Sequence, residues 1–191
     1  PQGAHPQTPR SGPGHRAARA REVDRAGVYR KRAEEIKAAA SIHLWNSDGQ
    51  YFMSHVNPTN KDTDVAICLG VYPFEAWESG DRMISMSIDA VKRERWNEDA
   101  GGMLCLPDTP NESFWFYHTA IFLLGVSAIN DFRTESAILT SLEKNITPQG
   151  LVPEQIGSHN GHLRGGNFLA TAQACLLLYA YFGRESTQEE M

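Results

Sequence analysis

The pattern of apolar and polar residues predicts two kinds of helix that alternate along the chain. In the first kind, apolar residues recur every three or four positions, as they do over residues 28–45, 81–96 and 134–146. Such amphipathic helices lie on the outside of a packed layer. In the second kind nearly every position is apolar, as over residues 63–74, 112–130 and 167–183. Helices of the second kind have to be buried, because every side of them avoids water.

The alternation has a constant period. The apolar segments begin near residues 63, 114 and 167, a spacing of roughly 52 residues. A repeat of outer helix, loop and inner helix at a fixed period indicates a stacked helical array. We therefore predict an all-α fold with about three helical hairpins that form part of a toroid. An irregular helical bundle is the alternative.

The ends of the chain lack this pattern. Residues 1–23 are rich in proline, glycine and arginine and show no apolar periodicity. We expect a disordered tail there, a helical body at residues 24–184 and a second tail at 185–191. For the N-terminal segment, a basic arm that binds nucleic acid and a solvated linker both remain open.

Charge is distributed unevenly and limits the choice of partner. The net charge is −5, yet the first 32 residues carry eight basic and two acidic groups, which leaves ten basic and 21 acidic residues for the rest. An acidic body repels phosphate, so we expect no nucleic acid as the main partner. No apolar stretch reaches the length of about 18 residues that a membrane span needs, so we expect no membrane partner.

Cysteine and histidine spacing gives no metal or redox motif. Cys68, Cys105 and Cys175 lie far apart, which favours reduced thiols and a cytoplasmic location. His159 and His162 are separated as metal ligands can be, but no third ligand lies near them in the sequence. We therefore expect neither a metal nor a cofactor.

A long polar loop precedes each predicted inner helix, at residues 54–64, 101–113 and 146–166. In a stacked array these loops emerge on one face, where helix N-termini favour oxygen-rich ligands. They carry carboxylates and amides that suit a carbohydrate site with tryptophan nearby, namely Asp62, Asp64, Asp108, Glu112, Glu154, Asn111, Gln155 and Asn160. Asp62 and Asp64 can also be simple helix caps.

Glu154 is the most distinctive of these residues. It stands between a proline and a glutamine in the glycine-rich loop GLVPEQIGSHNG, and glutamate has no backbone role in turns. Inverting hydrolysis of a glycosidic bond needs one protonated carboxyl group and one carboxylate base, separated by roughly 6.5–9.5 Å. An aimed carboxylate could be that base. An ordinary surface loop residue is the alternative.

The order of three segments resembles glycoside hydrolase family 15, the glucoamylase-like enzymes. The segments are LWNSDGQYF followed by KDTDVAICLGVYPF, then LPDTPNESFWFYHTAIFLL, and finally GLVPEQIGSHNG, within residues 28–184. The resemblance implies an (α/α)6 barrel, with Glu154 as the general base. It also implies that Asp108 and Trp115 line the sugar pocket, and we add Gln155 and Asp64 as candidates for substrate binding.

The activity implied by this resemblance is inverting hydrolysis of terminal α-linked glucose from starch-like glucans or malto-oligosaccharides. The general acid of the family lies in an upstream Trp-Glu motif that has no counterpart in these 191 residues. The resemblance therefore covers the C-terminal half of a catalytic domain. We expect the exposed half-ring to self-associate or to pair with a missing N-terminal half. A non-catalytic helical-repeat module that binds glycan or protein is the alternative.

Overall fold

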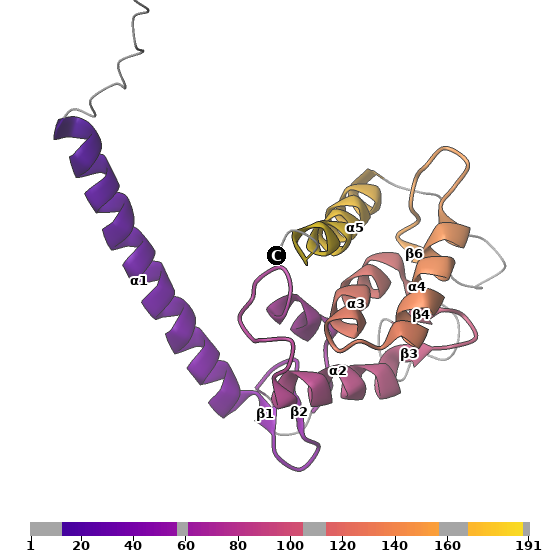
Figure 1. Cartoon of the computed structure of the whole chain (residues 1–191). Helices are drawn as coiled ribbons and strands as arrows, with labels where there is room; N and C mark the ends of the chain where they lie inside the picture. The colour runs from indigo at the N-terminus through magenta and orange to yellow at the C-terminus, as the bar shows by residue number, and fades with distance from the viewer. Residues whose placement is uncertain (1–12, 57–60, 105–113, 157–167, 189–191) are drawn as a thin grey trace, which may run out of the picture. The chain divides into compact units, whose positions relative to one another are not determined.

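Helices account for most of the residues that the structure describes. This computed structural model describes residues 13–56, 61–104, 114–156 and 168–188. The α-helices and one 3-10 helix, η1, are shown in Figure 1: α1 (Pro13–His43), η1 (Val65–Gly70), α2 (Arg82–Arg95), α3 (Phe116–Ala128), α4 (Phe132–Asn145) and α5 (Phe168–Gln188). The predicted all-α class is confirmed at this level, and closure into a toroid stays a prediction.

Short antiparallel ladders connect the helices. Each strand in the described segments has two residues: β1 (Trp45–Asn46) pairs with β2 (Tyr51–Phe52), β3 (Trp96–Asn97) with β4 (Gly102–Met103), and β5 (Phe114–Trp115) with β6 (Gln155–Ile156). A single bridge between Leu104 and Phe114 links the second ladder to the third. The ladders therefore tie together the segments that lead into and out of the helices.

The chain divides into two compact units, residues 1–40 and 41–191. The first unit holds most of α1, which begins at Pro13, upstream of the boundary at residue 24 that the apolar pattern predicts. Alanine and arginine favour helix even without an apolar face, and proline is accepted at the first helical position. Residues 1–12 lie outside the described residues, and the assignment of tails and body stays a prediction.

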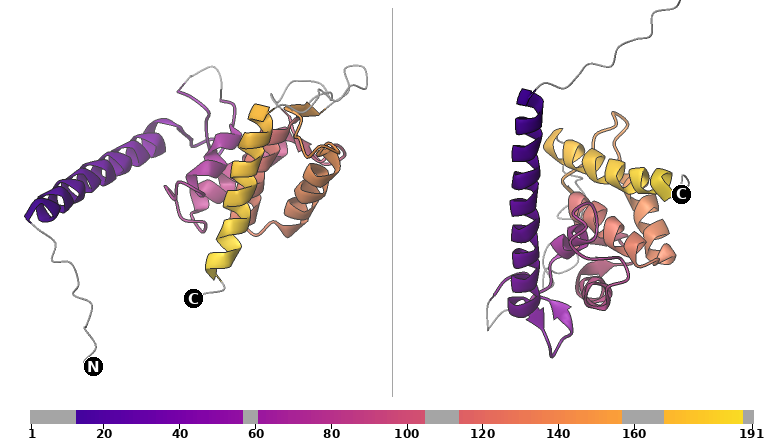
Figure 2. Two further views of the ribbon diagram at one scale, coloured as in Figure 1. Left: turned by 90° about the horizontal axis from the view of Figure 1, so that it is seen from above. Right: turned by 60° about the vertical axis from the view of Figure 1, so that its left-hand side comes forward.

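Helix α3 lies at the centre of the second unit. It packs against η1, α4 and α5, and Figures 1 and 2 show it beside α4 and α5. Phe116, Phe122, Leu123, Leu124 and Val126 on α3 are inaccessible to solvent. Because these residues point to different sides of the helix, neighbours have to cover it all round. The prediction of a buried helix over residues 112–130 is confirmed for the described part of that segment.

The flanking helix α2 is amphipathic, as predicted. Ile84, Ile88 and Val91 form its buried stripe, with no exposed surface. The helix begins where Asp81 accepts hydrogen bonds from the backbone N–H groups of Met83 and Ile84 at 2.8 and 3.4 Å. An N-terminal cap and an apolar stripe are therefore enough to explain its position.

The segment at residues 63–74 differs from the prediction of a long inner helix. Only the short η1 forms there, and it is followed by turns. The carbonyl oxygen of Gly70 accepts the backbone N–H groups of Ala76 and Trp77 at 2.8 and 3.1 Å, so the chain folds back at this residue. Pro73 cannot donate a helical hydrogen bond, which prevents the helix from continuing.

Helix α5 is the second departure, because only one of its faces is buried. Ala174 and Tyr181 are buried, whereas Leu176, Tyr179 and Phe182 are 71%, 80% and 55% exposed. The prediction that this segment is buried on all sides is therefore wrong for the second unit as described. An exposed apolar face of this kind promotes association. Self-association itself stays a prediction.

An ion pair joins α2 to the start of α4. The ammonium group of Lys92 lies 2.5 Å from a carboxylate oxygen of Asp131, which also caps α4 through the N–H of Thr134. Burial acts to raise the pKa of Asp131, but the hydrogen bonds from Lys92 and Thr134 and the charge of Lys92 outweigh it, so the pKa is lowered. The pair therefore stabilises the fold while Asp131 is ionised.

The substitution Asp131→Asn isolates this contribution, because asparagine still caps a helix. We expect it to lower the free energy of unfolding by about 1 kcal/mol at neutral pH. A group whose pKa is lowered on folding loses its contribution as the pH falls below its ordinary value of about 4. Urea unfolding at pH 7 and pH 3 measures this, and the difference between the two proteins should shrink at pH 3. An equal difference at both values would contradict the assignment.

Candidate active site

A two-residue ladder joins the loop that carries Glu154 to the start of α3. In the β5–β6 pair, Trp115 lies opposite Gln155. Next to this pair, the backbone N–H of Phe116 donates to the carbonyl oxygen of Glu154 at 3.1 Å. Trp115 is thus brought to Glu154 and Gln155, which lie about 40 positions further along the sequence, at the N-terminal end of α3.

The segment before Glu154 is fixed to the body of the fold. The backbone N–H of Val152 donates to the hydroxyl oxygen of Thr171, on α5, at 2.9 Å. Val152 and Pro153 are buried, whereas Glu154 is half-buried. Gly150 has φ +75°, a conformation that favours glycine, so the loop turns sharply just upstream. Buried neighbours on one side and the ladder on the other hold the backbone of Glu154 in place.

Aromatic rings gather beside this ladder. The ring of His118 stacks on Trp115, with centroids 5.6 Å apart and planes at 25°, and Tyr117 meets Trp115 edge-on at 5.5 Å. The pKa of His118 is lowered to about 4, chiefly by burial; the charge of Asp64 opposes this shift and the charge of Arg95 adds to it. The imidazole is therefore neutral at neutral pH, and it forms a cluster of aromatic rings with Trp115 and Tyr117.

Asp64 lies before η1 and has a structural role. It caps this helix, with one carboxylate oxygen accepting the backbone N–H of Ala66 at 2.7 Å, and its side chain is exposed. Its charge also acts on the His118 imidazole. The helix-cap reading of Asp64 is confirmed, and a role in substrate binding stays a prediction.

The loop before Asp64 is anchored by residues that sequence analysis missed. The hydroxyl of Thr63 donates to a carboxylate oxygen of Glu94 at 2.6 Å, and the guanidinium of Arg95 donates to the carbonyl oxygen of Thr63 at 2.5 Å. Arg95 is buried, one turn beyond Val91 on the apolar stripe of α2. A charged residue on an apolar stripe is the sequence signal that could have identified this anchor.

Several predicted residues lie outside the described ranges. Asp108 falls in residues 105–113, and His159 and His162 fall in residues 157–167. The proposed contact of Asp108 with sugar therefore stays a prediction. In the ranges that the structure describes, no cluster of three or more His, Cys, Asp or Glu side chains could hold a metal ion. Likewise, none of the described helices is both long and apolar enough to cross a membrane.

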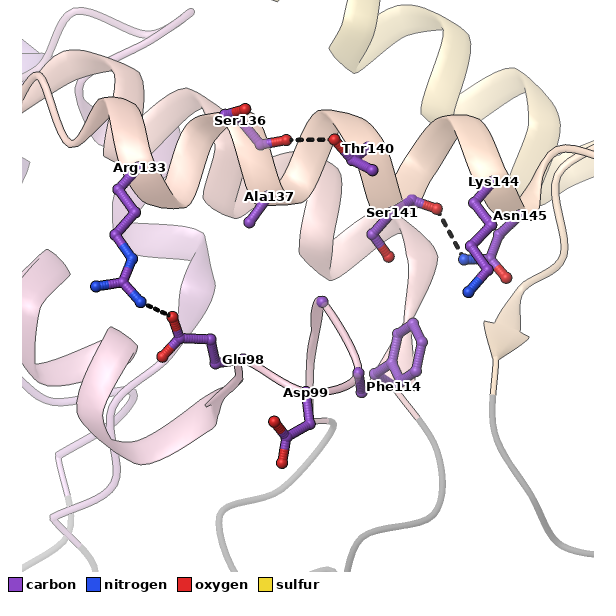
Figure 3. A pocket seen from close by; sticks show the side chains of 12 residues that line it. Glu98, Asp99, Phe114, Arg133, Ser136, Ala137, Thr140, Ser141, Lys144 and Asn145 are labelled. Atoms are coloured by element: carbon purple, nitrogen blue, oxygen red, sulfur yellow. Dashed lines mark hydrogen bonds and ion pairs between the residues drawn. The ribbon is translucent and has the colours of Figure 1, made fainter.

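Two pockets that are lined by described residues do not include Glu154, Gln155 or Trp115. One of about 600 Å³ is formed between residues 98–101 and α4 and is shown in Figure 3. Phe114 lines it, but its neighbour Trp115 does not. Another, of about 550 Å³, lies at the link between α3 and α4. The candidate active site is accordingly defined by the ladder and its aromatic rings, which are held by specific contacts, and not by either pocket.

Comparison with known proteins gives a likeness of fold. No protein-family model matches the chain, and no curated protein matches it. Among solved structures, it is similar to a glycosidase described as wild type and to a glutamate-to-alanine glycosidase variant in complex with glucose. Each has a TM-score of 0.66 and 16% sequence identity, and the match covers 82% of this chain and 44% of the other. The chain thus has a glycosidase-like fold and spans less than half of those proteins.

Proposed function

We propose that this chain is part of a glycoside hydrolase of the glucoamylase-like type, family 15. The reaction is inverting hydrolysis of terminal α-linked glucose from starch-like glucans or malto-oligosaccharides. Glu154 is the general base that takes a proton from the attacking water. Trp115, Gln155, Asp64 and Asp108 are assigned to sugar binding, and no residue of this chain is assigned as the general acid.

The observation that supports this proposal best is the pairing of β5 with β6. It joins the Pro-Glu-Gln segment to the segment that contains Trp115, at the end of a buried helix. Both segments carry the family resemblance, and the Pro-Glu-Gln segment is the more specific of the two. The likeness in fold to glycosidases, one of them in complex with glucose, agrees with the same choice.

The surroundings of Glu154 suit a general base. Its backbone is held on both sides, which fixes the point from which the carboxylate extends, and a positioned base needs such an anchor. Carboxylates next to an aromatic platform recognise sugars, because the ring faces pack on C–H groups while oxygens accept hydroxyl protons. The neutral His118 supports the platform without adding a positive charge.

The stereochemistry of the product tests the proposed reaction. Incubation of the assembled catalytic domain, this chain together with the segment that supplies the general acid, with maltotetraose should release β-glucose first, which proton NMR distinguishes from α-glucose during the first minutes. Inversion is expected because a base-activated water attacks the face opposite the leaving group. Release of α-glucose would contradict the proposal. Binding of maltotetraose without release of any sugar would favour the non-catalytic glycan-binding module.

Trp115 offers a separate test of sugar binding. The substitution Trp115→Ala, made together with Glu154→Gln so that the sugar is not consumed, should weaken the affinity for maltotetraose by about tenfold. Titration calorimetry measures this change. Phe132→Ala is the matched control, because Phe132 is an aromatic side chain that is 71% exposed and lies at the start of α4. An equal loss in both variants would remove Trp115 from the site.

A further inference from the structure

The pocket of about 600 Å³ has a clear architecture. One wall is the turn between β3 and β4, residues 98–101, and the other is a face of α4 that runs from Arg133 to Asn145. Figure 3 shows the side chains of Thr140 and Ser141 on this helix above the turn. A volume of this size is within the range of pockets that hold small molecules.

Specific contacts keep the two walls in place. Gly101 has φ +65°, and a Cβ at this position would lie 2.9 Å from the Cβ of Ser141, so only glycine lets the turn approach α4 this closely. At the Arg133 end of the helix face, the guanidinium of Arg133 pairs with the carboxylate of Glu98 across the opening. The close approach at Gly101 therefore fixes one end of the pocket, and the exposed Arg133–Glu98 pair spans the other.

The polar groups of the pocket are suited to hydroxyl groups. The hydroxyl of Thr140 donates to the carbonyl oxygen of Ser136 at 2.9 Å, and the amide nitrogen of Asn145 donates to the carbonyl oxygen of Ser141 at 2.7 Å. The hydroxyl oxygen of Thr140 and the amide oxygen of Asn145 keep lone pairs that can accept hydrogen bonds. A hydroxylated ligand can supply the donors that these acceptors need.

The charges in the pocket cancel. Glu98 and Asp99 are balanced by Arg133 and Lys144, and Glu98 already pairs with Arg133. A small anion would gain one cation and meet one remaining carboxylate, so the pocket offers it little net attraction. An uncharged ligand with many hydroxyl groups meets acceptors and donors without this opposition.

The pocket is separate from the candidate active site. Phe114 and Trp115 are adjacent in β5, and neighbouring side chains of a strand point to opposite faces. Phe114, 8% exposed, lines the pocket, whereas Trp115 stacks with His118. Strand β5 thus carries one residue toward the pocket and the next toward the ring of His118.

We propose that this pocket is a second saccharide-binding site, which takes a neutral mono- or disaccharide unit of a glucan. The choice of a glucan rests on the proposed function, whereas the preference for a neutral polyol rests on the pocket itself. A glucan bound in this pocket is held on the protein without entering the site of Glu154.

The test uses the full chain with Glu154→Gln, so that no sugar is hydrolysed, and maltose as the probe. Titration followed by proton–nitrogen NMR should shift the backbone signals of Gly101, Ser136 and Thr140 in a saturable way. The double variant Ser136→Ala/Thr140→Val should weaken this response by about tenfold. Glu143→Gln, an exposed change on α4 that does not line the pocket, should leave the response unaltered.

Other results would overturn the inference. Maltose shifts that are the same in the double variant, or none at these residues, would remove the site. A response to inorganic phosphate in place of maltose would identify an anion site instead. Trp115→Ala should leave these shifts unchanged, and Ser136→Ala/Thr140→Val should leave maltotetraose hydrolysis unchanged. Failure of hydrolysis together with saturable pocket binding would therefore count against the proposed function alone.

Discussion

Replacing Glu154 by glutamine is expected to lower the rate of maltotetraose hydrolysis by about 10²- to 10⁴-fold. Glutamine has nearly the same shape and can keep the backbone contact with Phe116, but its amide cannot take a proton from water. The loss should appear in kcat with little change in KM, because the base acts on water and not on the bound sugar. Initial rates of glucose release measure both constants.

The control for this prediction is Glu143→Gln. Glu143 is an exposed glutamate on α4, so its replacement removes the same charge without touching the ladder. Its rate should match that of the unmodified protein. If Glu154→Gln retained full activity, Glu154 would be an ordinary loop residue and the assignment of a base would be lost.

The second large effect is expected at Gly125, where α3 packs on η1. A methyl group at this position would press on the sulfur of Cys68 and lie 2.9 Å from its Cβ, well inside the normal carbon–carbon contact distance. Cys68 is completely buried and cannot move away freely. Overpacked cores lose about 1–3 kcal/mol, and we expect Gly125→Ala to lie at the upper end of this range. Urea denaturation measures the loss.

A rescue experiment distinguishes this clash from a general effect of alanine. Adding Cys68→Ala removes the sulfur and should restore at least about half of the stability lost in Gly125→Ala. The matched control is Gly183→Ala on α5, where a Cβ would have no neighbour within 4 Å. This change should be neutral or slightly stabilising. Equal losses at Gly125 and Gly183 would contradict the close packing of η1 on α3.

The predictions were most accurate for helices whose own apolar pattern matches the residues that are buried. The stripe of Ile84, Ile88 and Val91 and the apolar run of α3 are both buried as the sequence indicates. In α2, the period of the apolar pattern and the cap at Asp81 both indicate a helix that begins at Arg82. An apolar pattern predicts that a helix face is buried even when the elements that cover this face are not known.

The prediction of helices buried on all sides failed where it rested on apolar content alone. Residues 63–74 are as apolar as α3, but Gly70 and Pro73 end the helix after η1. In α5, Leu176 and Tyr179 are exposed because the described helices cover only the opposite face. Composition gives the tendency of a segment to be buried, whereas the packing of neighbouring elements determines how much of its surface is buried.

Sequence analysis placed Glu154 and Gln155 on a loop and Trp115 near the start of a predicted inner helix, and the structure brings these three together. It could not give the pairing of Trp115 with Gln155, because register depends on how distant segments meet. It also missed the anchoring of Thr63 by Glu94 and Arg95, which requires α2 to lie beside that loop. Local chemistry was visible in the sequence, whereas these contacts arise only when the chain folds.

The exposed face of α5 also determines how the chain responds to salt. From Phe168 to Gly183 this helix carries no charged residue, whereas residues 1–32 carry eight basic ones. Raising the ionic strength screens contacts that depend on charge, and sulfate strengthens the burial of apolar surface. Ammonium sulfate would therefore tighten any association through α5 and loosen any association through the basic segment.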